Sequence, residues 1–328
     1  MKQFQVIVIG GGSAGYAGAR TFFDEGQRRI AIVDGANTLG GLCILRGCMP
    51  SKTLLYSAET LHLAGQGDVF GFDQVKLKPD MTLMQQRKKE IISDFAQYRT
   101  QQLEDDRVSL YRSGARFLDE STIELTDGRK LKADHFLIAT GSKIAMPPIP
   151  GLNKVGFKTS DDVLELEEVP DETIVLGGGI VACELAQFLN RIGTKVTLLQ
   201  RSENILREFP QNSSVCVREK FAKEGMVVKT GVTMEGLKQI NEQTIRVNYL
   251  HGGKKETLET KFLFHALGRK PSTDGLNLEE IGVELESSGH VRTNAFQQSS
   301  IPHIYAAGDC AGPHEIVHVA IRQGETAA

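Results

Sequence analysis

The chain has 328 residues, and its 38 Lys and Arg residues against 41 Asp and Glu residues give a formal net charge of −3. This balance offers no basic excess that would favour a nucleic-acid or anionic membrane partner, and no apolar run reaches the ~20 residues of a membrane span. Hydrophobic residues make up 40% of the chain, and its 34 glycines exceed the usual proportion of about 7%. We therefore expect a globular protein of two or three domains in which glycine permits tight turns or close approach to a ligand.

The cysteines and the N-terminus indicate a reducing compartment. Five cysteines are an odd number, in a chain too long for a small disulfide scaffold. The apolar stretch Val6–Ile9 is shorter than the hydrophobic region of a signal peptide, and it is typical of a buried strand. We therefore expect a cytoplasmic protein, in which any disulfide would be catalytic or redox-sensing.

One pattern occurs twice: an apolar strand, three glycines, a helix with small residues and a second apolar strand. The first copy spans Phe4–Asp34 and the second spans Glu172–Arg201. Each copy has about thirty residues, the size of a βαβ unit. The sequence therefore predicts an α/β fold with two Rossmann-like dinucleotide-binding domains.

The segments between and after the two copies give a coarse secondary structure. Apolar residues at helical spacing predict a helix over Met81–Asp105, and strands are predicted within Arg107–Glu124 and Arg129–Ile138. A proline cluster in Leu137–Leu152 and the segment Ala266–Leu276 indicate domain boundaries. The end of the chain predicts a strand, a glycine turn and a helix.

The first glycine turn has the spacing of a dinucleotide site. In Gly10-x-Gly12-x-x-Gly15, the first glycine allows a tight turn, the second lets the backbone approach a pyrophosphate, and the third lets the helix pack on the strand. Asp34 ends the second strand, where a carboxylate can accept hydrogen bonds from a ribose. A chance glycine turn is the alternative, but the strand, helix, second strand and terminal acid together favour the nucleotide site.

The second turn differs from the first where its second strand ends. The turn contains Gly177 and Gly179, but the strand ends in Gln200 and Arg201 rather than in an acid. An acid would repel a 2′-phosphate, whereas arginine favours one, and Arg207 lies close enough in sequence to join Arg201. The alternative is a solvated arginine pair on a loop. We favour NADPH over NADH at this site.

Two cysteines lie close together in a glycine-rich segment after the first copy. Cys43 and Cys48 stand in GGLCILRGCMPSK, which spans Gly40–Lys52. A zinc half-site is disfavoured, because no second Cys/His pair has matching spacing elsewhere. Two buried thiols or a redox-active pair beside the nucleotide site are the remaining interpretations.

With this segment, the chain resembles the flavin-dependent pyridine nucleotide-disulfide oxidoreductases, which include dihydrolipoamide dehydrogenase, glutathione reductase and mercuric reductase. Motifs in the family's order carry the resemblance across residues 4–328: the first fingerprint, GGLCILRGCMPSK, the turn Ala139-Thr140-Gly141-Ser142, the second fingerprint GGGIVACE, and IYAAGD. The resemblance implies an FAD-binding domain built from residues 1–150 and 275–328. An NAD(P)-binding domain, residues 151–274, would be inserted between these two parts.

The resemblance also implies the site residues. Cys48 would be the thiol nearest the flavin, Cys43 the interchange thiol facing the substrate, and Lys52 would pair with Glu184 beside flavin N5. FAD would be bound by Gly10, Gly12, Gly15, Asp34, Gly41, Lys52, Gly114, Ala115, Thr140, Gly141, Ser142, Asp309 and Val317. NAD(P) would be bound by Gly177, Gly179, Ile180, Glu184, Gln200, Arg201, Arg207, Val232 and Gly268. Hydride would pass from nicotinamide to flavin, the flavin would reduce the disulfide, and the released thiol would attack an external disulfide.

The chain departs from the family pattern at three places. Leu42 stands where the family usually has Thr, and Leu45 and Arg46 replace the usual residues between the cysteines. Arg46 would either change the substrate choice or lie in solvent. Family chains also continue beyond the point that matches Ala328, with a dimer-forming domain that donates a His–Glu acid/base pair to the partner subunit. The family homodimer is therefore doubtful for this chain, which is either part of a longer protein or uses its thiols differently.

The expected function is an FAD-dependent NAD(P)H:disulfide oxidoreductase of the dihydrolipoamide dehydrogenase type. Its substrate would be a small-molecule or protein-bound disulfide. The alternatives are an NAD(P)H diaphorase, a mercuric-reductase-like activity, and a non-catalytic flavin-binding module. The retained cysteine pair argues against the last of these.

One competing motif and three further cysteines need an interpretation. His314–His318 reads HEIVH and matches the zinc-protease signature, which needs both histidines on one face of a helix. We expect no metal there, because the flavin-type turn at Asp309 accounts for the segment. Cys183, Cys216 and Cys310 are expected to be buried thiols.

Overall fold

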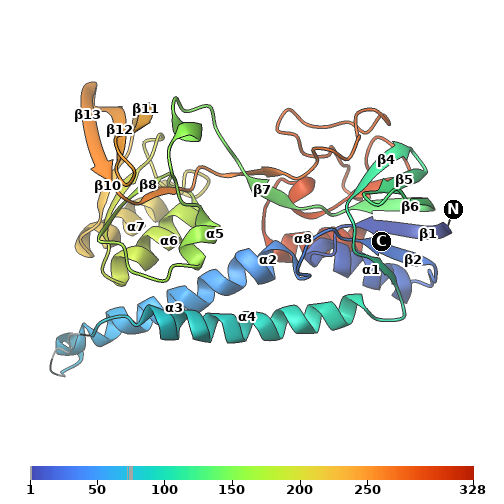
Figure 1. Cartoon of the computed structure of the whole chain (residues 1–328), viewed down its shortest axis with the longest axis horizontal. Coiled ribbons are helices and arrows are strands. Elements are labelled where there is room, and N and C mark those ends of the chain that lie inside the picture. Colours follow the sequence, from blue (N-terminus) through green and yellow to red (C-terminus); the bar gives the residue numbers. More distant parts are fainter. Residues whose placement is uncertain (1, 72, 74–76) are drawn as a thin grey trace. The chain divides into compact units, whose positions relative to one another are not determined.

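The computed structural model describes residues 2–71, 73 and 77–328, which form two compact units (Figure 1). The first unit comprises Met1–Met49, Ile91–Lys143 and Arg269–Ala328. The second comprises Pro50–Glu90 and Ile144–Gly268. The domain boundaries expected after residues 150 and 274 stay predictions.

A seven-stranded sheet forms the centre of the first unit, in the order β3-β2-β1-β6-β5-β4, with β16 also on β6. Strand β1 pairs in parallel with β2 and with β6, and both faces of these strands bury apolar side chains, as is usual for parallel strands. The strands are β1 (Lys2–Ile9), β2 (Ile30–Val33), β3 (Ser109–Tyr111), β4 (Ala115–Asp119), β5 (Thr122–Leu125), β6 (Lys130–Ile138) and β16 (Ile304–Ala306).

Two helices of the first unit, α1 (Ser13–Asp24) and α8 (Val317–Ala327), pack side by side (Figure 1). Glycine allows this close contact. A Cβ atom on Gly324 would lie 2.2 Å from the carbonyl oxygen of Ala14, and a Cβ on Gly18 would lie 2.4 Å from a methyl group of Leu137. The helix after the first glycine turn is thereby held against the helix that follows β16.

Three further helices carry the segment between the two βαβ units. They are α2 (Gly41–Arg46), α3 (Cys48–Ala64) and α4 (Met81–Leu103). Short 3-10 turns, η1 (Gly67–Phe70) and η3 (Gly308–Cys310), follow α3 and β16. The helix expected over Met81–Asp105 is therefore confirmed as α4.

The second unit contains a four-stranded parallel sheet in the order β10-β9-β8-β14 and a three-stranded antiparallel sheet in the order β11-β12-β13. Its parallel strands are β8 (Glu172–Leu176), β9 (Lys195–Leu199), β10 (Val227–Lys229) and β14 (Leu263–His265). Its helices are α5 (Ser160–Leu164), α6 (Ile180–Arg191) and α7 (Gln211–Lys223), with the 3-10 turn η2 (Leu152–Lys154). The antiparallel strands are β11 (Thr233–Gln239), β12 (Ile245–His251) and β13 (Lys254–Thr260), and a separate ribbon pairs β7 (Ser142–Ile144) with β15 (Arg269–Pro271).

The α/β fold class and the two predicted βαβ units are confirmed. Both units repeat a strand, a glycine turn, a helix and a parallel neighbouring strand: β1-α1-β2 in the first and β8-α6-β9 in the second. Among the helices that the structure describes, none is both long enough and apolar enough to cross a membrane.

The contact between α1 and α8 gives a prediction for Gly324→Ala. Alanine favours helices by about 1 kcal/mol over glycine, but its Cβ would meet the Ala14 carbonyl and force the helices apart. We expect the free energy of unfolding in urea to fall by about 1–3 kcal/mol. Gly156→Ala is the control, because a Cβ there meets no atom within 4 Å. Equal or higher stability of Gly324→Ala would contradict the packing argument.

Candidate functional site

The first glycine turn brings backbone atoms closer together than side chains would permit. Gly10 has a φ of +106°, and a Cβ on it would lie 2.3 Å from the carbonyl oxygen of Ala139. A Cβ on Gly15 would lie 1.9 Å from the carbonyl oxygen of Gly10. The strand-to-helix turn can therefore close only with glycine at these two positions.

The mouth of this turn is free of side chains. Gly12 precedes α1 without a side-chain cap, so the first N–H groups of the helix are open to an anion. Gly41 lies against it, since a Cβ on Gly41 would come within 2.7 Å of the Gly12 Cα. Two glycine backbones therefore border a place where a phosphate can reach the helix N-terminus.

Asp34 is fixed by the backbone at the end of β2. One of its oxygens accepts a hydrogen bond from Gly11 N–H at 2.7 Å, and the other accepts from Ala36 N–H at 2.8 Å. Each carboxylate oxygen keeps a second lone pair for a ribose hydroxyl. The next residue, Gly35, lies against Gly114, because a Cβ on Gly35 would be 2.8 Å from the Gly114 nitrogen. Gly114 and its neighbour Ala115 thus flank the turn that follows Asp34.

A second polar group of the first unit surrounds Asp309. Ser142 Oγ donates to Asp309 Oδ2 at 2.6 Å, and Arg269 Nε donates to Ser142 Oγ at 2.8 Å. Within the described residues, the buried hydroxyl of Thr140 has no hydrogen-bond partner. The sequence did not point to Arg269, although it follows Gly268 in the segment ALGRKPSTDGL, which signalled only a domain boundary.

The two cysteines of the glycine-rich segment lie together. Cys43 stands in α2, Cys48 begins α3, and both are half-buried thiols that are not joined by a disulfide. The hydrogen bond with Cys48 raises the pKa of Cys43, and burial raises it further. The positive charge of Arg99, whose guanidinium lies 4.3 Å from the Tyr16 ring centre, opposes this shift. The raised pKa therefore keeps the proton on Cys43.

The second glycine turn has the same backbone geometry as the first. Gly177 has a φ of +117°, and a Cβ on it would lie 2.3 Å from the carbonyl oxygen of Ala266. Gly179 precedes α6 without a side-chain cap, and a Cβ there would meet nothing within 4 Å. The N-terminus of α6 is therefore as open to a phosphate as that of α1.

Gln200 occupies in the second turn the place that Asp34 has in the first. It is the first residue after β9, and its side chain lies against Gly178, because a Cβ on Gly178 would come within 3.0 Å of it. The Gln200 amide donates to Ser202 Oγ, and Val232 N–H donates to the Gln200 carbonyl oxygen at 3.0 Å. Arg201 and Arg207 are both exposed, and the side chain of Arg207 lies 3.9 Å from that of Glu208. No acidic side chain replaces Asp34 at this strand end.

Lys52 and Glu184 form an ion pair within the second unit. The Nζ atom of Lys52 donates to both oxygens of Glu184, at 2.7 and 2.6 Å. Lys52 lies in the second turn of α3 and Glu184 in the second turn of α6. The structure thus makes the contact that the family resemblance implies.

The remaining predicted residues lie at the ends of elements. Ile180 begins α6, Val317 begins α8, Gly141 has a φ of +69°, and Gly268 has a φ of +106° with no atom within 4 Å of a Cβ.

The HEIVH segment does not have the geometry of a zinc site. Helix α8 begins at Val317, so His314 and Glu315 precede it and the two histidines do not share a helix face. In the part of the chain that the structure describes, no group of three or more His, Cys, Asp or Glu residues is arranged to hold a metal ion.

The prediction of three buried thiols was wrong for one of them. Cys183 and Cys310 are buried, but Cys216 is exposed on α7. Helix α7 presents this face to solvent, and its sequence, QNSSVCVREKFAK, is too polar to have marked Cys216 as a core position.

A family model described as pyridine nucleotide-disulphide oxidoreductase matches residues 4–324. The chain belongs to this family. It is 35% identical to a mercuric reductase of Lysinibacillus sphaericus over 322 residues, which are 98% of this chain and 58% of that protein. It is 32% identical to a dihydrolipoyl dehydrogenase of Bacillus subtilis over 330 residues, which are 98% of this chain and 70% of that protein. The chain thus spans less than two thirds of the mercuric reductase.

A solved structure shows the same fold. The Cu(II) complex of the HOCl-induced flavoprotein disulfide reductase RclA from Escherichia coli superposes with a TM-score of 0.85 at 24% identity, covering 98% of this chain and 69% of that one. Members of the family are FAD-dependent NAD(P)H:disulfide oxidoreductases.

The residues of the first unit fit FAD. The glycine backbones at Gly12 and Gly41 leave the N-terminus of α1 open to a pyrophosphate. Asp34 has lone pairs for a ribose, and the buried Thr140 hydroxyl lacks a partner within the described residues. These features occur along the first unit in the order in which the family motifs predict the flavin site.

The hydrogen bond from Ser142 to Asp309 gives a prediction for Ser142→Ala. Losing a hydrogen bond to a charged group costs about 1.5–3 kcal/mol, and the freed carboxylate loses its fixed orientation. We expect FAD to dissociate about tenfold more readily, as measured by the rise of flavin fluorescence on dilution. Ser121→Ala, in the turn between β4 and β5, is the control. Unchanged FAD retention would show that Asp309 does not contribute to flavin binding through this orientation.

Proposed function

We propose that the chain passes electrons from NAD(P)H through FAD to the Cys43–Cys48 pair, as a disulfide oxidoreductase of the dihydrolipoamide dehydrogenase type. One observation carries the proposal: the two thiols are hydrogen-bonded to each other in the segment that follows the first nucleotide fold. A binding module has no need of such a pair. The relatives named dihydrolipoyl dehydrogenase support the substrate class.

The chain's own residues divide the work as follows. Bound FAD supplies two-electron transfer between the nicotinamide and the disulfide. Reduction of the disulfide adds two electrons and two protons and yields two thiols. The raised pKa keeps the proton on Cys43. Cys43 therefore attacks a substrate disulfide only when a base removes that proton.

Lys52 and Glu184 act as the charged pair beside the reacting part of the flavin in this proposal. Lys52 donates hydrogen bonds to both oxygens of Glu184, and these bonds hold its ammonium group in one place. A fixed positive charge there favours a reduced, negatively charged ring. The family homodimer, in which the partner subunit would supply the base, stays doubtful for this chain as a prediction.

We propose NADPH as the preferred nucleotide. Gln200 replaces the acid that would repel a 2′-phosphate, and the exposed Arg201 is the next residue. Arg207 pairs with the exposed Glu208 at 3.9 Å, a contact that a phosphate would outcompete.

A second candidate function is the reduction of a soft metal ion. Mercuric reductases of Lysinibacillus sphaericus and Staphylococcus aureus are 35% and 36% identical to the chain. A pair of adjacent thiols suits a soft ion such as Hg(II), because thiolate is a soft ligand. Two electrons from NADPH would convert Hg(II) to elemental mercury. In this case Hg(II), and not lipoamide, would support turnover.

An anaerobic titration with NADPH tests the electron path. We expect a yellow protein whose flavin bleaches and which develops a long-wavelength absorbance band from the Cys48 thiolate beside the flavin. Cys48→Ser should bleach without the band, whereas Cys216→Ser, an exposed thiol on α7, should behave as the wild type. Bleaching without the band in the wild type would indicate a diaphorase, and a protein without flavin would overturn the proposal.

The choice of nucleotide is tested with Arg201→Ala. Losing a charge-assisted contact to the 2′-phosphate costs about 1.5–3 kcal/mol, so we expect the KM for NADPH in dye reduction to rise about tenfold or more. The KM for NADH should stay the same, because NADH has no 2′-phosphate. Arg246→Ala on β12, where Arg246 pairs with Glu259, is the control. Parallel changes for both nucleotides would show that Arg201 does not recognise the phosphate.

A further inference from the structure

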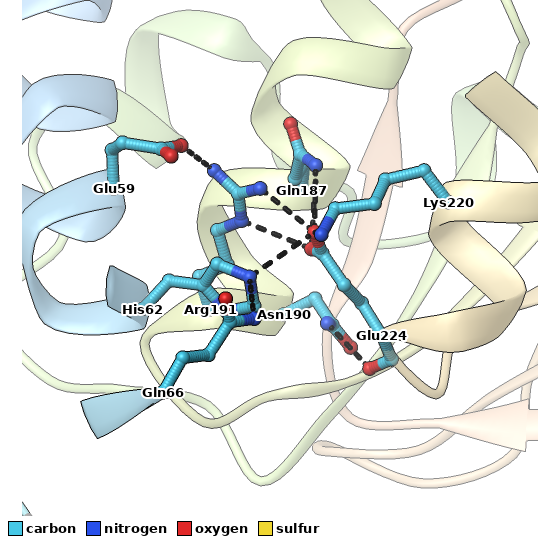
Figure 2. Close-up of polar contacts among 8 residues, drawn as sticks. All are labelled: Glu59, His62, Gln66, Gln187, Asn190, Arg191, Lys220 and Glu224. Carbon is cyan, nitrogen blue, oxygen red and sulfur yellow. Dashed lines mark hydrogen bonds and ion pairs between the residues drawn. The ribbon is translucent and has the colours of Figure 1, made fainter. Parts of the chain in front are cut away.

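Helices α3 and α6 are joined by two ion pairs of opposite polarity. Lys52 of α3 binds Glu184 of α6. Seven residues further along both helices, Glu59 of α3 binds Arg191 of α6 (Figure 2). Residues seven apart lie on the same face of a helix. The two pairs therefore mark one line of contact between the helices, with the charges exchanged between its ends.

The pair at the N-terminal ends of the helices is too exposed to set its own position. The side chains of Lys52 and Glu184 are 58% and 32% exposed, and exposed ion pairs contribute little to stability because water and salt screen them. The side chains of Arg191 and Glu224 at the other end of the line are only 8% and 4% exposed. The geometry at that end is therefore the more strongly determined of the two.

Arg191 is held by two acids at once. Its Nε and Nη2 atoms donate to the two oxygens of Glu224, at 2.9 and 2.7 Å, while Nη1 donates to Glu59 (Figure 2). Burial raises the pKa of Glu224, but hydrogen bonds from Arg191 and Lys220 outweigh burial and bring it to about 2. Glu224 thus stays ionised, and the two-pronged contact fixes the plane of the guanidinium.

His62 adds a second contact from α3. Its Nε2 atom lies 3.5 Å from Glu224 Oε1 and 2.8 Å from the side-chain nitrogen of Gln66. Burial lowers the pKa of His62, although the charge of Glu224 opposes this shift. In a neutral ring, the Nε2 atom that accepts a hydrogen bond from the Gln66 amide donates none to Glu224, so His62 lies against the buried pair one turn beyond Glu59 without a hydrogen bond to it.

Apolar packing lies along the same two helices. Leu54 and Ala58 of α3 are fully buried in the core that includes Leu185 and Leu189 of α6. Apolar contact holds the two helices together, but it does little to fix their register, because the hydrophobic effect is non-directional. Directional ion pairs at both ends of this packing supply that choice.

We infer that Glu59, His62, Arg191 and Glu224, here termed the α3–α6 clamp, are positioning residues that set the register of the two helices and so hold Lys52 against Glu184. A slide of seven residues would place Lys52 level with Arg191, where two positive charges would repel. The inference rests on the proposed function, in which Lys52 and Glu184 stand beside the flavin. It assigns the placement of that pair to a cluster two helical turns away, in which Arg191 and Glu224 are buried and Glu59 is 44% exposed.

The experiment compares Glu59→Gln with Lys220→Gln in the holoenzyme. Glu59→Gln removes the charged contact from α3, whereas Lys220→Gln removes an equally charged partner of Glu224 that lies on α7. In stopped-flow reduction by saturating NADPH, we expect Glu59→Gln to slow flavin bleaching about three- to tenfold with little change in the NADPH concentration at half-maximal rate, because misplacing a positioned group costs rate. Lys220→Gln should match the wild type. Equal slowing in both variants would overturn the inference.

A double-mutant cycle shows whether the clamp acts through Lys52. In the Lys52→Gln background, Glu59→Gln should slow bleaching no further, because the pair that the clamp positions is already gone. Sites more than ~10 Å apart without shared partners usually have additive effects. If the rate effects of Glu59→Gln and Lys52→Gln multiply in the double variant, the inference is contradicted.

Unfolding of the FAD-free chain judges the clamp independently of the proposed function. If NADPH fails to bleach the wild-type flavin, the proposed function fails. The clamp is then tested by comparing the urea unfolding of four proteins: the wild type, Glu59→Gln, Lys52→Gln and the double variant. Non-additive shifts of the midpoint for Glu59→Gln and Lys52→Gln would support the common register, and additive shifts would overturn it.

Discussion

Steric exclusion at the glycine turns is the constraint on which the rest of the structure depends. At Gly10 and Gly177 the chain turns from strand to helix so tightly that a Cβ would lie 2.3 Å from a carbonyl oxygen of the neighbouring strand end. The turns leave the N-termini of α1 and α6 uncapped and open. The proposed phosphate sites, the placement of Asp34 and Gln200, and the position of Glu184 on α6 all depend on this geometry.

The two folds diverge in function at one chemical difference. Asp34 and Gln200 each follow the second strand of their βαβ unit and each lie against the middle glycine of the turn. A carboxylate accepts hydrogen bonds from ribose hydroxyls, whereas an amide beside Arg201 tolerates a phosphate. In the proposed function, one backbone arrangement would therefore serve two different nucleotides through a change of side chain.

The α3–α6 clamp extends this argument from binding to alignment. Electron transfer depends on side chains from separate segments meeting at fixed distances, and an exposed pair such as Lys52 and Glu184 does not enforce that by itself. A buried, bidentate pair such as Arg191 and Glu224 does. The second unit thus combines an exposed pair where chemistry is proposed with a buried one that supplies the geometry.

Much of the site was predictable from the sequence, because its signals are local. The spacing of Gly10, Gly12 and Gly15, the acid at Asp34 and the two close cysteines lie within 50 residues and express steric and chemical needs of short segments. Local spacing alone is not decisive: HEIVH has the zinc signature, but α8 begins too late to place both histidines on one helix face. For Cys216, the polar sequence of α7 was a local sign of exposure, which the expectation of a buried thiol overlooked.

The sequence by itself determined the two dinucleotide folds, the family and the residues of its motifs, because backbone turns and strand patterns depend on neighbours along the chain. Only the tertiary structure decided which distant side chains meet. Arg269 reaches Ser142 across 127 positions, and Arg191 reaches Glu59 across 132. Such contacts depend on how helices and strands pack in three dimensions, and no spacing along the chain encodes them.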